Sequence, residues 1–544
     1  MRLSGLGRGP LCAVLLALVA TAPVTAGDEG LQQRIRAHIE FLASDLLEGR
    51  EAGTPGYDIA AAYVASQFRQ IGLEPAGQQG SYYQQVPLRR AWQEAGSAEL
   101  SLRRDERVQA FRFVEEFYIS PNTGASSVDV EAPMVFAGYG IEAPALDYSD
   151  LDQVDLAGKI AVILSGQPVH FPSEEGAHFG SSREKAMGLA RRGALGSITI
   201  FTPRNEKRSP WSRVRSRVGK PSMSWLDEGG RPYPDYGEYT ARARLHYRPA
   251  AELFAGAPFS LQQLIDMDEA GEGLPVFPLE GTARVSQQVR HENVHSANVV
   301  AVLPGSDPTL SSEHLVYVAH LDHIGTLAGE GHEDAIRNGA LDNASGISIM
   351  IETARMFAGG ERPRRSILFL AVTAEEKGLV GSEYFARNPT VPRDAMVGVI
   401  NIDMPILLYD FADLIAFGAE HSTISDAIGT AAQAFDTRLT PDPFPEQNLF
   451  VRSDHYRFVQ QGIPAVFLVT GIHSRSENED ADAIFGEFIR KHYHRTSDEA
   501  SLPIHYGAAA RFTRINHRAG ALIANGRERP RWHEGDFFGE AFGR

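Results

Sequence analysis

The chain has 544 residues, too many for one hydrophobic core, so two or three domains are expected. Its composition, with 43% hydrophobic and 22% charged residues, is that of an ordinary globular protein. The formal net charge of −17 argues against nucleic acid as a partner, because phosphate backbones attract basic surfaces.

The first 26 residues have the pattern of a secretory signal peptide. Arg2 and Arg8 precede the apolar run Leu11–Ala20, and the small residues of Val24–Ala26 end at a predicted cleavage site before Gly27. The alternative is a membrane anchor, but the run is shorter than the ~20 residues that a spanning helix needs. We therefore expect a secreted or periplasmic protein without stable membrane insertion.

Cys12 is the only cysteine in the sequence and lies within this predicted signal peptide. A lipoprotein cysteine would follow the apolar run, whereas Cys12 stands at its start. The mature chain is therefore expected to have neither a disulfide nor thiol chemistry, although its predicted destination is oxidising.

The chain after the predicted cleavage site begins with two packing helices. Apolar residues recur at helical spacing in Leu31–Leu47, and a second helical pattern runs from Tyr57 to Ile71. The segment Gly49–Gly56, which contains a proline, separates the two helices. The next predicted elements are a loop and a strand, at Gly77–Val86 and Ala98–Leu102.

From about residue 105 to residue 292 the pattern changes to short strands separated by turns. The predicted elements are one helix and three strands, at Arg183–Arg192, Met134–Phe136, Ile160–Leu164 and Ser197–Phe201. The basic stretch from Pro203 to Pro221 is interpreted as a solvated loop, with a partner site as the alternative. We find no metal-ligand set, nucleotide loop or nucleophile motif in this sequence, and interpret it as an inserted domain.

The second half of the chain alternates strands with helices, which predicts an α/β domain with a mainly parallel sheet and helices on both faces. The predicted strands are Asn298–Leu303, Leu315–Ala319, Ile367–Val372, Val397–Ile402 and Ala465–Val469. The predicted helices are Ala344–Phe357, Ile424–Phe435 and Ala508–Ala524. The tail after Arg527 is rich in aromatic residues, so we expect it to dock on the body.

Four polar motifs stand beside these predicted elements. Three adjoin strands and one opens a helix: A-H-L-D-H at 319–323, T-A-E-E-K at 373–377, I-N-I-D-M at 400–404 and G-A-L-D-N-A-S-G at 339–346. Their histidine and carboxylates should meet at the sheet edge where open α/β folds bind ligands. These residues are His320, Asp342, Glu376 and Asp403. Each alone is more often structural, but the set suits zinc.

The motifs H-x-D, D-N-A-S-G, E-E, N-x-D-M and Y-H, in this order, resemble the co-catalytic dizinc exopeptidases of the bacterial aminopeptidase type. That family includes glutamate carboxypeptidase, glutaminyl cyclase and the transferrin receptor ectodomain. The resemblance covers 296–525 strongly and 30–75 more loosely. In addition, G-Y-G-I at 138–141 and D-L-A-G-K-I-A-V at 155–162 resemble the protease-associated domain often inserted in such peptidases.

The resemblance implies a zinc exopeptidase fold with a β-rich protease-associated domain inserted in it. The predicted segments are a signal peptide at 1–26, the N-terminal part of the peptidase domain at 27–104, the inserted domain with flanking strands at 105–292, and the main peptidase domain with the C-terminal tail at 293–544. Peptides would be the substrates of such a protein.

The resemblance also implies two zinc ions per chain. One zinc would be bound by His320 and Asp403 and the other by Glu376 and His494, with Asp342 bridging the two. His494 is preferred to a neighbouring histidine, at position 492, because the family's histidine follows a tyrosine, which stands at position 493 here.

Two further residues have roles implied by the resemblance. Glu375 would be the general base that takes a proton from a metal-bridging water and passes it to the leaving amine. Asp322 would orient the imidazole of His320 from behind. His323 and His455 receive no role.

The sequence departs from the family's pattern at two places. The motif Y-H-R-T-S-D at 493–498 lacks a proline that is frequent there. Phe450 stands where some members have a tyrosine that stabilises the oxyanion, which leaves the metal, Arg452, His455 or Tyr456 as the donor.

We also expect a cis peptide bond between Asp342 and Asn343, because the bridging aspartate of related dizinc peptidases is often followed by one. A sharp reversal of the backbone here would let one carboxylate address two cations. The alternative is a turn with an ordinary trans peptide bond, which is far more frequent than a cis bond that does not involve proline.

The sequence therefore predicts a zinc-dependent exopeptidase, with aminopeptidase as the preferred activity. The alternatives are a carboxypeptidase of the same fold, which should place arginines at the substrate carboxylate, and a glutaminyl cyclase, which needs one zinc. A non-catalytic receptor-like module is the fourth interpretation. Such relatives lose ligands, whereas this chain keeps all five and Glu375. The sequence does not indicate an oligomeric state.

Overall fold

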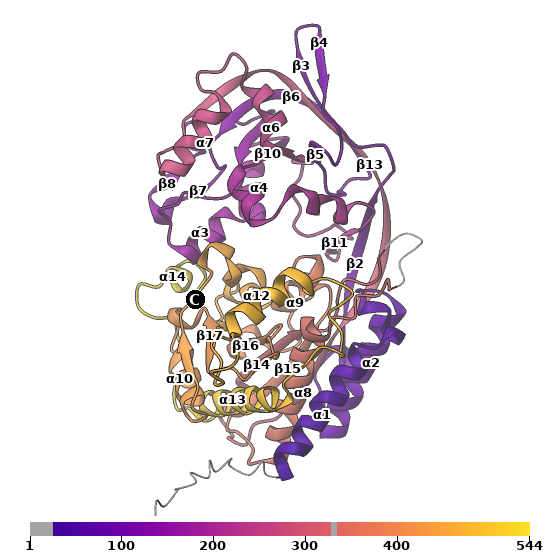
Figure 1. The fold of residues 1–544 in the computed structure, drawn as a ribbon, viewed down its shortest axis with the longest axis vertical. Helices are drawn as coiled ribbons and strands as arrows, with labels where there is room; N and C mark the ends of the chain where they lie inside the picture. The colour runs from indigo at the N-terminus through magenta and orange to yellow at the C-terminus, as the bar shows by residue number, and fades with distance from the viewer. Residues whose placement is uncertain (1–25, 328–333, 544) are drawn as a thin grey trace, which may run out of the picture.

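The structure, a computed structural model, describes residues 26–327 and 334–543 (Figure 1). Most of the predicted signal peptide, including Cys12, lies outside the described residues. Two lobes are stacked along the long axis, with the inserted region at the top of Figure 1 and the helices α1 and α2 at the bottom right. Among the described residues, no helix combines the length and the apolar character that crossing a membrane requires.

The lower lobe is built on one mixed sheet with a parallel centre. Its strand order is β11–β2–β13–β15–β14–β16–β19–β17–β18, and the pairs among β15, β14, β16 and β19 are parallel. The central strands are β13 (Val276–Leu303), β15 (Ser366–Val372), β14 (His314–His320), β16 (Met396–Ile402) and β19 (Ala465–Thr470). The outer strands are β1 (Glu74–Pro75), β2 (Tyr83–Gln93), β11 (Ser222–Trp225), β17 (Asp413–Phe417) and β18 (Arg438–Thr440). The predicted α/β class with a mainly parallel sheet is confirmed.

Both faces of the central part of this sheet are buried, which explains why β14, β15, β16 and β19 are almost entirely apolar. Leu315, Tyr317 and Ala319 of β14 belong to one core, and the alternating Val316 and Val318 belong to another. The first core is covered by α1 (Ala26–Leu42), α2 (Pro55–Ile71), α8 (Gly346–Gly359), α10 (Ile424–Gln433) and α13 (Tyr506–Asn525). The second is covered by α9 (Val380–Arg387), α11 (His455–Val459) and α14 (Phe537–Phe542).

The upper lobe has a second sheet with its own apolar core. The strand order is β4–β3–β13–β6–β9–β10–β12–β5. Its strands are β3 (Glu99–Arg104), β4 (Arg107–Ala110), β5 (Phe117–Tyr118), β6 (Ser127–Ala137), β9 (Ile160–Leu164), β10 (Gly196–Phe201) and β12 (Ala241–His246). A separate hairpin is formed by β7 (Glu142–Ala143) and β8 (Tyr148–Ser149). The helices are α3 (Ser173–Gly180), α4 (Ser182–Arg191), α5 (Pro203–Arg208), α6 (Tyr247–Ala250) and α7 (Leu261–Ala270).

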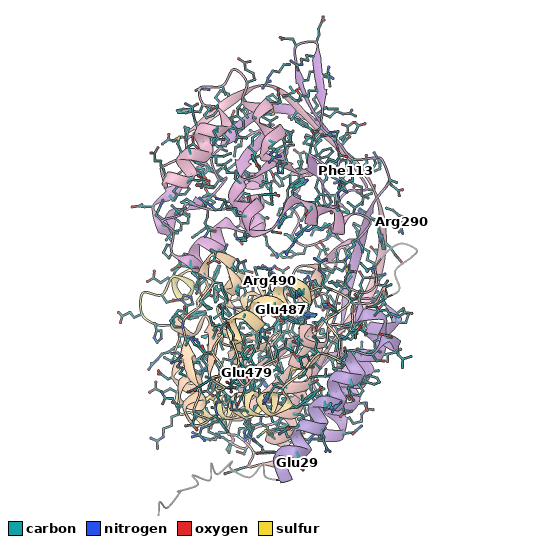
Figure 2. All side chains as sticks on the ribbon, in the orientation of Figure 1. Glu29, Phe113, Arg290, Glu479, Glu487 and Arg490 are labelled. Atoms are coloured by element: carbon teal, nitrogen blue, oxygen red, sulfur yellow. The ribbon has the colours of Figure 1, made fainter. Side chains whose placement is uncertain are left out.

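Strand β13 connects the two lobes, because its first half pairs with β6 and its second half pairs with β2. The predicted domain boundary at residue 292 therefore falls inside a continuous strand, and the boundaries at 105 and 292 stay predictions. Figure 2 shows the side chains of both lobes, with Phe113 in the upper lobe and Glu487 and Arg490 of α12 (Ala481–Lys491) near the boundary between the lobes.

Three local predictions differ from the structure. The first helix ends at Leu42 rather than residue 47, and a separate short turn follows at Asp45–Arg50. The predicted loop at 77–86 overlaps β2, whose polar and apolar residues alternate because only part of the strand is buried. The basic stretch 203–221 is helical in two pieces rather than a loop, since Thr202 caps α5 and Trp211 is buried.

The aromatic tail packs between the lobes, as expected. Phe538 on α14 is fully buried, with ring contacts to His178 of the upper lobe and to His421 and Phe450 of the lower lobe. Asp536, just before α14, forms an ion pair with His421 at 2.5 Å. The tail therefore joins both lobes at one point.

Replacing Phe538 with alanine should destabilise the protein by about 3–5 kcal/mol, because a fully buried aromatic ring would leave a cavity. Denaturant unfolding measures this change. Val108→Ala, on an exposed strand of the upper lobe, is the control and should have little effect. Equal stability of the two variants would show that tail docking contributes little.

Candidate metal centre

The predicted residues meet at the carboxyl edge of the parallel strands. His320 is the last residue of β14, and Asp403 directly follows β16. Glu375 and Glu376 form a turn shortly after β15. Asp342 comes from the segment Ala340–Ser345 that leads into α8. Parallel strands place their carboxyl ends at the same edge, so the convergence follows from the sheet.

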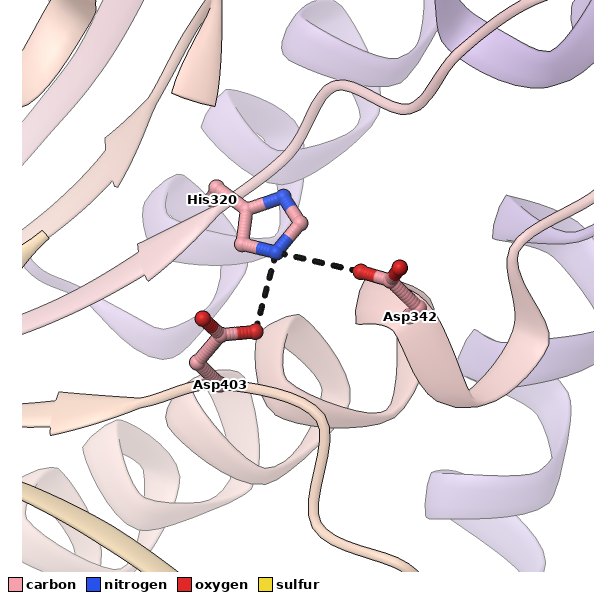
Figure 3. Close-up of side chains that lie close together, drawn as sticks. All are labelled: His320, Asp342 and Asp403. Carbon is pink, nitrogen blue, oxygen red and sulfur yellow. Dashed lines mark hydrogen bonds and ion pairs between the residues drawn. The ribbon is translucent and has the colours of Figure 1, made fainter. Parts of the chain in front are cut away.

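One group of donor atoms contains His320, Asp342 and Asp403 (Figure 3). The Nε2 atom of His320 lies 3.0 Å from Oδ1 of Asp403 and 3.3 Å from Oδ1 of Asp342. The imidazole is almost fully buried. These three residues agree with the predicted ligand set of the first zinc.

A second group uses the other oxygen of Asp342. The Nε2 atom of His494 lies 3.1 Å from Oδ2 of Asp342 and 3.2 Å from Oε2 of Glu376. His492 instead contacts Ser497, with its Nδ1 atom 2.9 Å from the hydroxyl oxygen. The structure therefore favours His494 over His492 and places Asp342 between the two groups. The Asp342–Asn343 peptide bond is cis, as predicted.

The charges of the cluster fit divalent cations. Burial, with Glu376 and Asp403, raises the pKa of Glu375 well above its ordinary value. Burial lowers the pKa of His494, but the carboxylates of Glu376 and Asp342 outweigh it and raise this pKa to about 10. Oδ2 of Asp342 and Oε1 of Glu376 are buried without a hydrogen bond, although imidazole nitrogens lie within 3.1 Å and 2.8 Å of them. Imidazole nitrogens and carboxylate oxygens are donors that zinc accepts.

Asp322 is placed differently from its predicted role. The Nδ1 atom of His320 contacts the backbone oxygen of Asp322 at 3.1 Å, not its carboxylate. The carboxylate accepts the backbone N–H groups of Glu375 at 3.0 Å and Glu376 at 3.3 Å. The reason is that these two N–H groups start a turn and need a buried acceptor. The Asp322 side chain therefore positions the Glu375–Glu376 turn.

Three positioning residues were missed from the sequence. Ser453 donates its hydroxyl to Oδ2 of Asp403 at 2.6 Å and accepts from the side chain of Asn401. The carboxylate of Asp498 accepts the N–H of Asp342 at 3.1 Å and that of the preceding residue at 2.9 Å. The buried guanidinium of Arg50 donates to four backbone carbonyls, among them those of residues 321 and 339. Of the three, only Asp498 stands in a motif singled out above, Y-H-R-T-S-D at 493–498.

A pocket opens onto the cluster. Its lining includes Glu375, Arg452, Tyr493 and apolar surface from Met404, Leu449 and Phe467. Of the side chains considered as oxyanion donors, Arg452 lines this pocket. The Tyr456 hydroxyl instead contacts Nδ1 of His178 at 2.5 Å, and the buried ring of His455 packs between Phe450 and Phe467.

The basic stretch of the upper lobe faces the rim of this pocket. The Arg208 guanidinium donates to the backbone oxygen of Glu446 at 2.9 Å, a few residues before Arg452. Burial and the nearby Arg337 lower the pKa of Lys220 to about 8. The carboxylate of Glu376 is close enough to Lys220 to raise this pKa and so partly opposes the effect. The stretch is helical rather than a loop, whereas most of its basic side chains are exposed, as expected for a solvated segment.

Comparison with known proteins finds one family whose profile matches most of the lower lobe. Residues 298–519 match the profile described as peptidase family M28, which confirms the resemblance. The chain is 26% identical over 260 residues to probable leucine aminopeptidase 2 of Aspergillus fumigatus, covering 46% of this chain and 48% of the relative. It is 30% identical over 137 residues to aminopeptidase NAALADL1 of Rattus norvegicus, covering 24% and 16%. The chain thus matches about half of the first relative's length and less of the second's.

A solved structure shows the same fold. The aminopeptidase from Aneurinibacillus sp. strain AM-1 superposes with a TM-score of 0.52 at 20% identity, covering 91% of this chain and 94% of that one. The predicted zinc exopeptidase fold is therefore confirmed, since the superposition spans both lobes.

Ser453→Ala should lower zinc affinity by about 10–100-fold, since the variant loses the hydrogen bond that orients Asp403. Isothermal titration of the metal-stripped protein measures this change. Thr513→Ala removes another buried hydroxyl, on α13, and is the control. An unchanged zinc affinity in Ser453→Ala would contradict the assignment of Asp403 as a ligand.

Proposed function

We propose that this protein, with its peptidase family M28 segment at 298–519, is a zinc-dependent aminopeptidase that removes residues from the amino end of peptides. The observation that carries the proposal is that Asp342 presents one oxygen to His320 and the other to His494, beside Glu375 in one pocket. The named relatives, both aminopeptidases, support the choice of the amino end.

Two zinc ions per chain would be held by five residues: His320, Asp342, Glu376, Asp403 and His494. Bound there, the ions would supply Lewis acidity toward the scissile carbonyl. The protein contributes rigid placement, because Asp342 is fixed through Asp498 and Asp403 through Ser453. Metal-binding groups that are already in position do not have to reorganise during the reaction.

Glu375 is the proposed general base. It lines the pocket but belongs to neither donor group, so its carboxylate is available to accept a proton from the attacking water and return it to the leaving amine. Arg452 is placed to donate to the oxygen on which negative charge develops. Tyr493, stacked on His494 at 3.8 Å between ring centroids, shields that side of the pocket.

A carboxypeptidase is the second candidate, because Arg452 lines the pocket and its guanidinium donates to a backbone oxygen, that of Gln447. An arginine there would also suit the carboxylate of a peptide's last residue. The end of the peptide that is attacked distinguishes the two activities.

We further propose that the upper lobe is a protease-associated domain that limits which substrates reach the pocket. Arg208 and Lys220 support this role, since they extend from the upper lobe toward the rim. The protein is proposed to be secreted or periplasmic, on the basis of the charged and apolar pattern of residues 1–26.

Hydrolysis of a peptide library, read by mass spectrometry, tests the proposed function. We expect loss of single residues from the amino end, no activity after chelation to negligible metal content, and recovery with zinc. Loss of residues from the carboxyl end would favour the carboxypeptidase. Full activity without metal would exclude both.

Glu375→Gln should bind zinc as the wild type does but lose about 10²–10⁴-fold in turnover, because the amide does not accept the proton. Glu376→Gln is the matched comparison, since it changes the adjacent carboxylate of the second donor group and should lose zinc. Zinc content and turnover are measured for both variants. Equal zinc loss in the two would show that the roles are misassigned.

A further inference from the structure

His323 lies inside the candidate metal centre but has no role in the proposed function. It follows Asp322 by one residue and is fully buried. Neither of its ring nitrogens makes a hydrogen bond to any described residue. Buried imidazoles normally satisfy at least one nitrogen, so this ring needs an explanation.

The ring faces the carboxylates of the second donor group. Its Nδ1 atom lies 2.8 Å from Oε1 of Glu376 and 3.8 Å from Oδ2 of Asp342, in contacts without hydrogen-bond geometry. Together these three residues form a group whose donor atoms all lie within 4.8 Å of one another. Glu376 thus presents one oxygen to His323 and the other to His494.

The surroundings hold the ring in this orientation. The backbone N–H of His323 donates to the carbonyl of Arg50 at 3.2 Å. Gly339 packs so closely that an added Cβ would lie 2.7 Å from the ring, so a side chain there would displace the imidazole. On another side the ring meets His494 edge to face, with 5.7 Å between centroids.

We propose that Nδ1 of His323 is a further ligand of the second zinc, in addition to Asp342, Glu376 and His494. The inference rests on the proposed function, because it presupposes that zinc occupies this centre. It makes the two sites unequal: the first has three protein ligands and the second has four. A site with four protein ligands is typical of tightly held zinc, whereas three leave a position open.

The test is zinc titration of metal-stripped protein, with His323→Ala and His323→Gln as variants. We expect one of two zinc affinities to fall by more than ~100-fold, which exceeds the loss for a residue that only orients a ligand. The same variants in an Asp403→Asn background, where the first group is disabled, should weaken the remaining site equally. Cobalt substitution adds a spectroscopic readout, since the visible absorption should change on losing a nitrogen ligand.

His314→Ala is the matched control, because His314 stands at the opposite end of the same strand, β14, with a buried nitrogen that also lacks a hydrogen bond. It should leave both affinities and the cobalt spectrum unchanged. Circular dichroism checks that each variant is folded. If His323→Ala does not fold, the comparison is made with His323→Gln.

Two outcomes overturn the inference and are distinguishable. If the wild type binds two zinc ions and both His323 variants match it in affinity and cobalt spectrum, only the role of His323 is wrong. If the wild type itself binds no zinc, the proposed function fails as well.

Discussion

The burial of several carboxylates at one point is the constraint on which this structure depends. Asp342, Glu376 and Asp403 lie beside one another at the sheet edge, with Glu375 next to them. Two like charges 4 Å apart repel by about 4 kcal/mol at an effective dielectric constant of 20. Protonated imidazoles offset part of this repulsion: burial opposes their protonation, but the neighbouring carboxylates outweigh burial at His320 and raise its pKa. Divalent cations would remove the repulsion without protons and fit the composition of the centre.

The rest of the fold holds these groups in place against that repulsion. The parallel strands supply the ends from which His320 and Asp403 project, and buried polar groups fix the loops between them. Asp322 secures the Glu375–Glu376 turn, and Arg50 fastens two loops through their carbonyls. The upper lobe is joined to the lower lobe by the continuous strand β13 and by the contacts of the tail. It places basic side chains near the rim of the pocket, among them Arg208. All members of the candidate metal centre lie in the lower lobe.

Much of the lower lobe was predictable because strands buried on both faces are continuous apolar runs, as in β14, β15 and β16. Three of the candidate ligands were predictable because they stand at the ends of such runs, namely His320, Glu376 and Asp403. Asp342 and His494 were predictable only from the order of the motifs. The role of Arg50 was not predictable, because its guanidinium donates hydrogen bonds to backbone carbonyl groups, which every sequence contains. The role of the Asp322 carboxylate depends on two N–H groups 53 and 54 residues away. For the same reason His323 carried no signal: its position against Glu376 comes from the pairing of β14 with β15, which is followed by the Glu375–Glu376 turn.

Anomalous diffraction at the zinc absorption edge would show whether zinc occupies both donor groups. We expect two zinc peaks in crystals of the protein, one on each side of the Asp342 carboxylate. One peak should lie next to His320 and Asp403, and the other next to Glu376, His494 and His323. A single peak, or zinc bound only elsewhere on the molecule, would contradict this expectation.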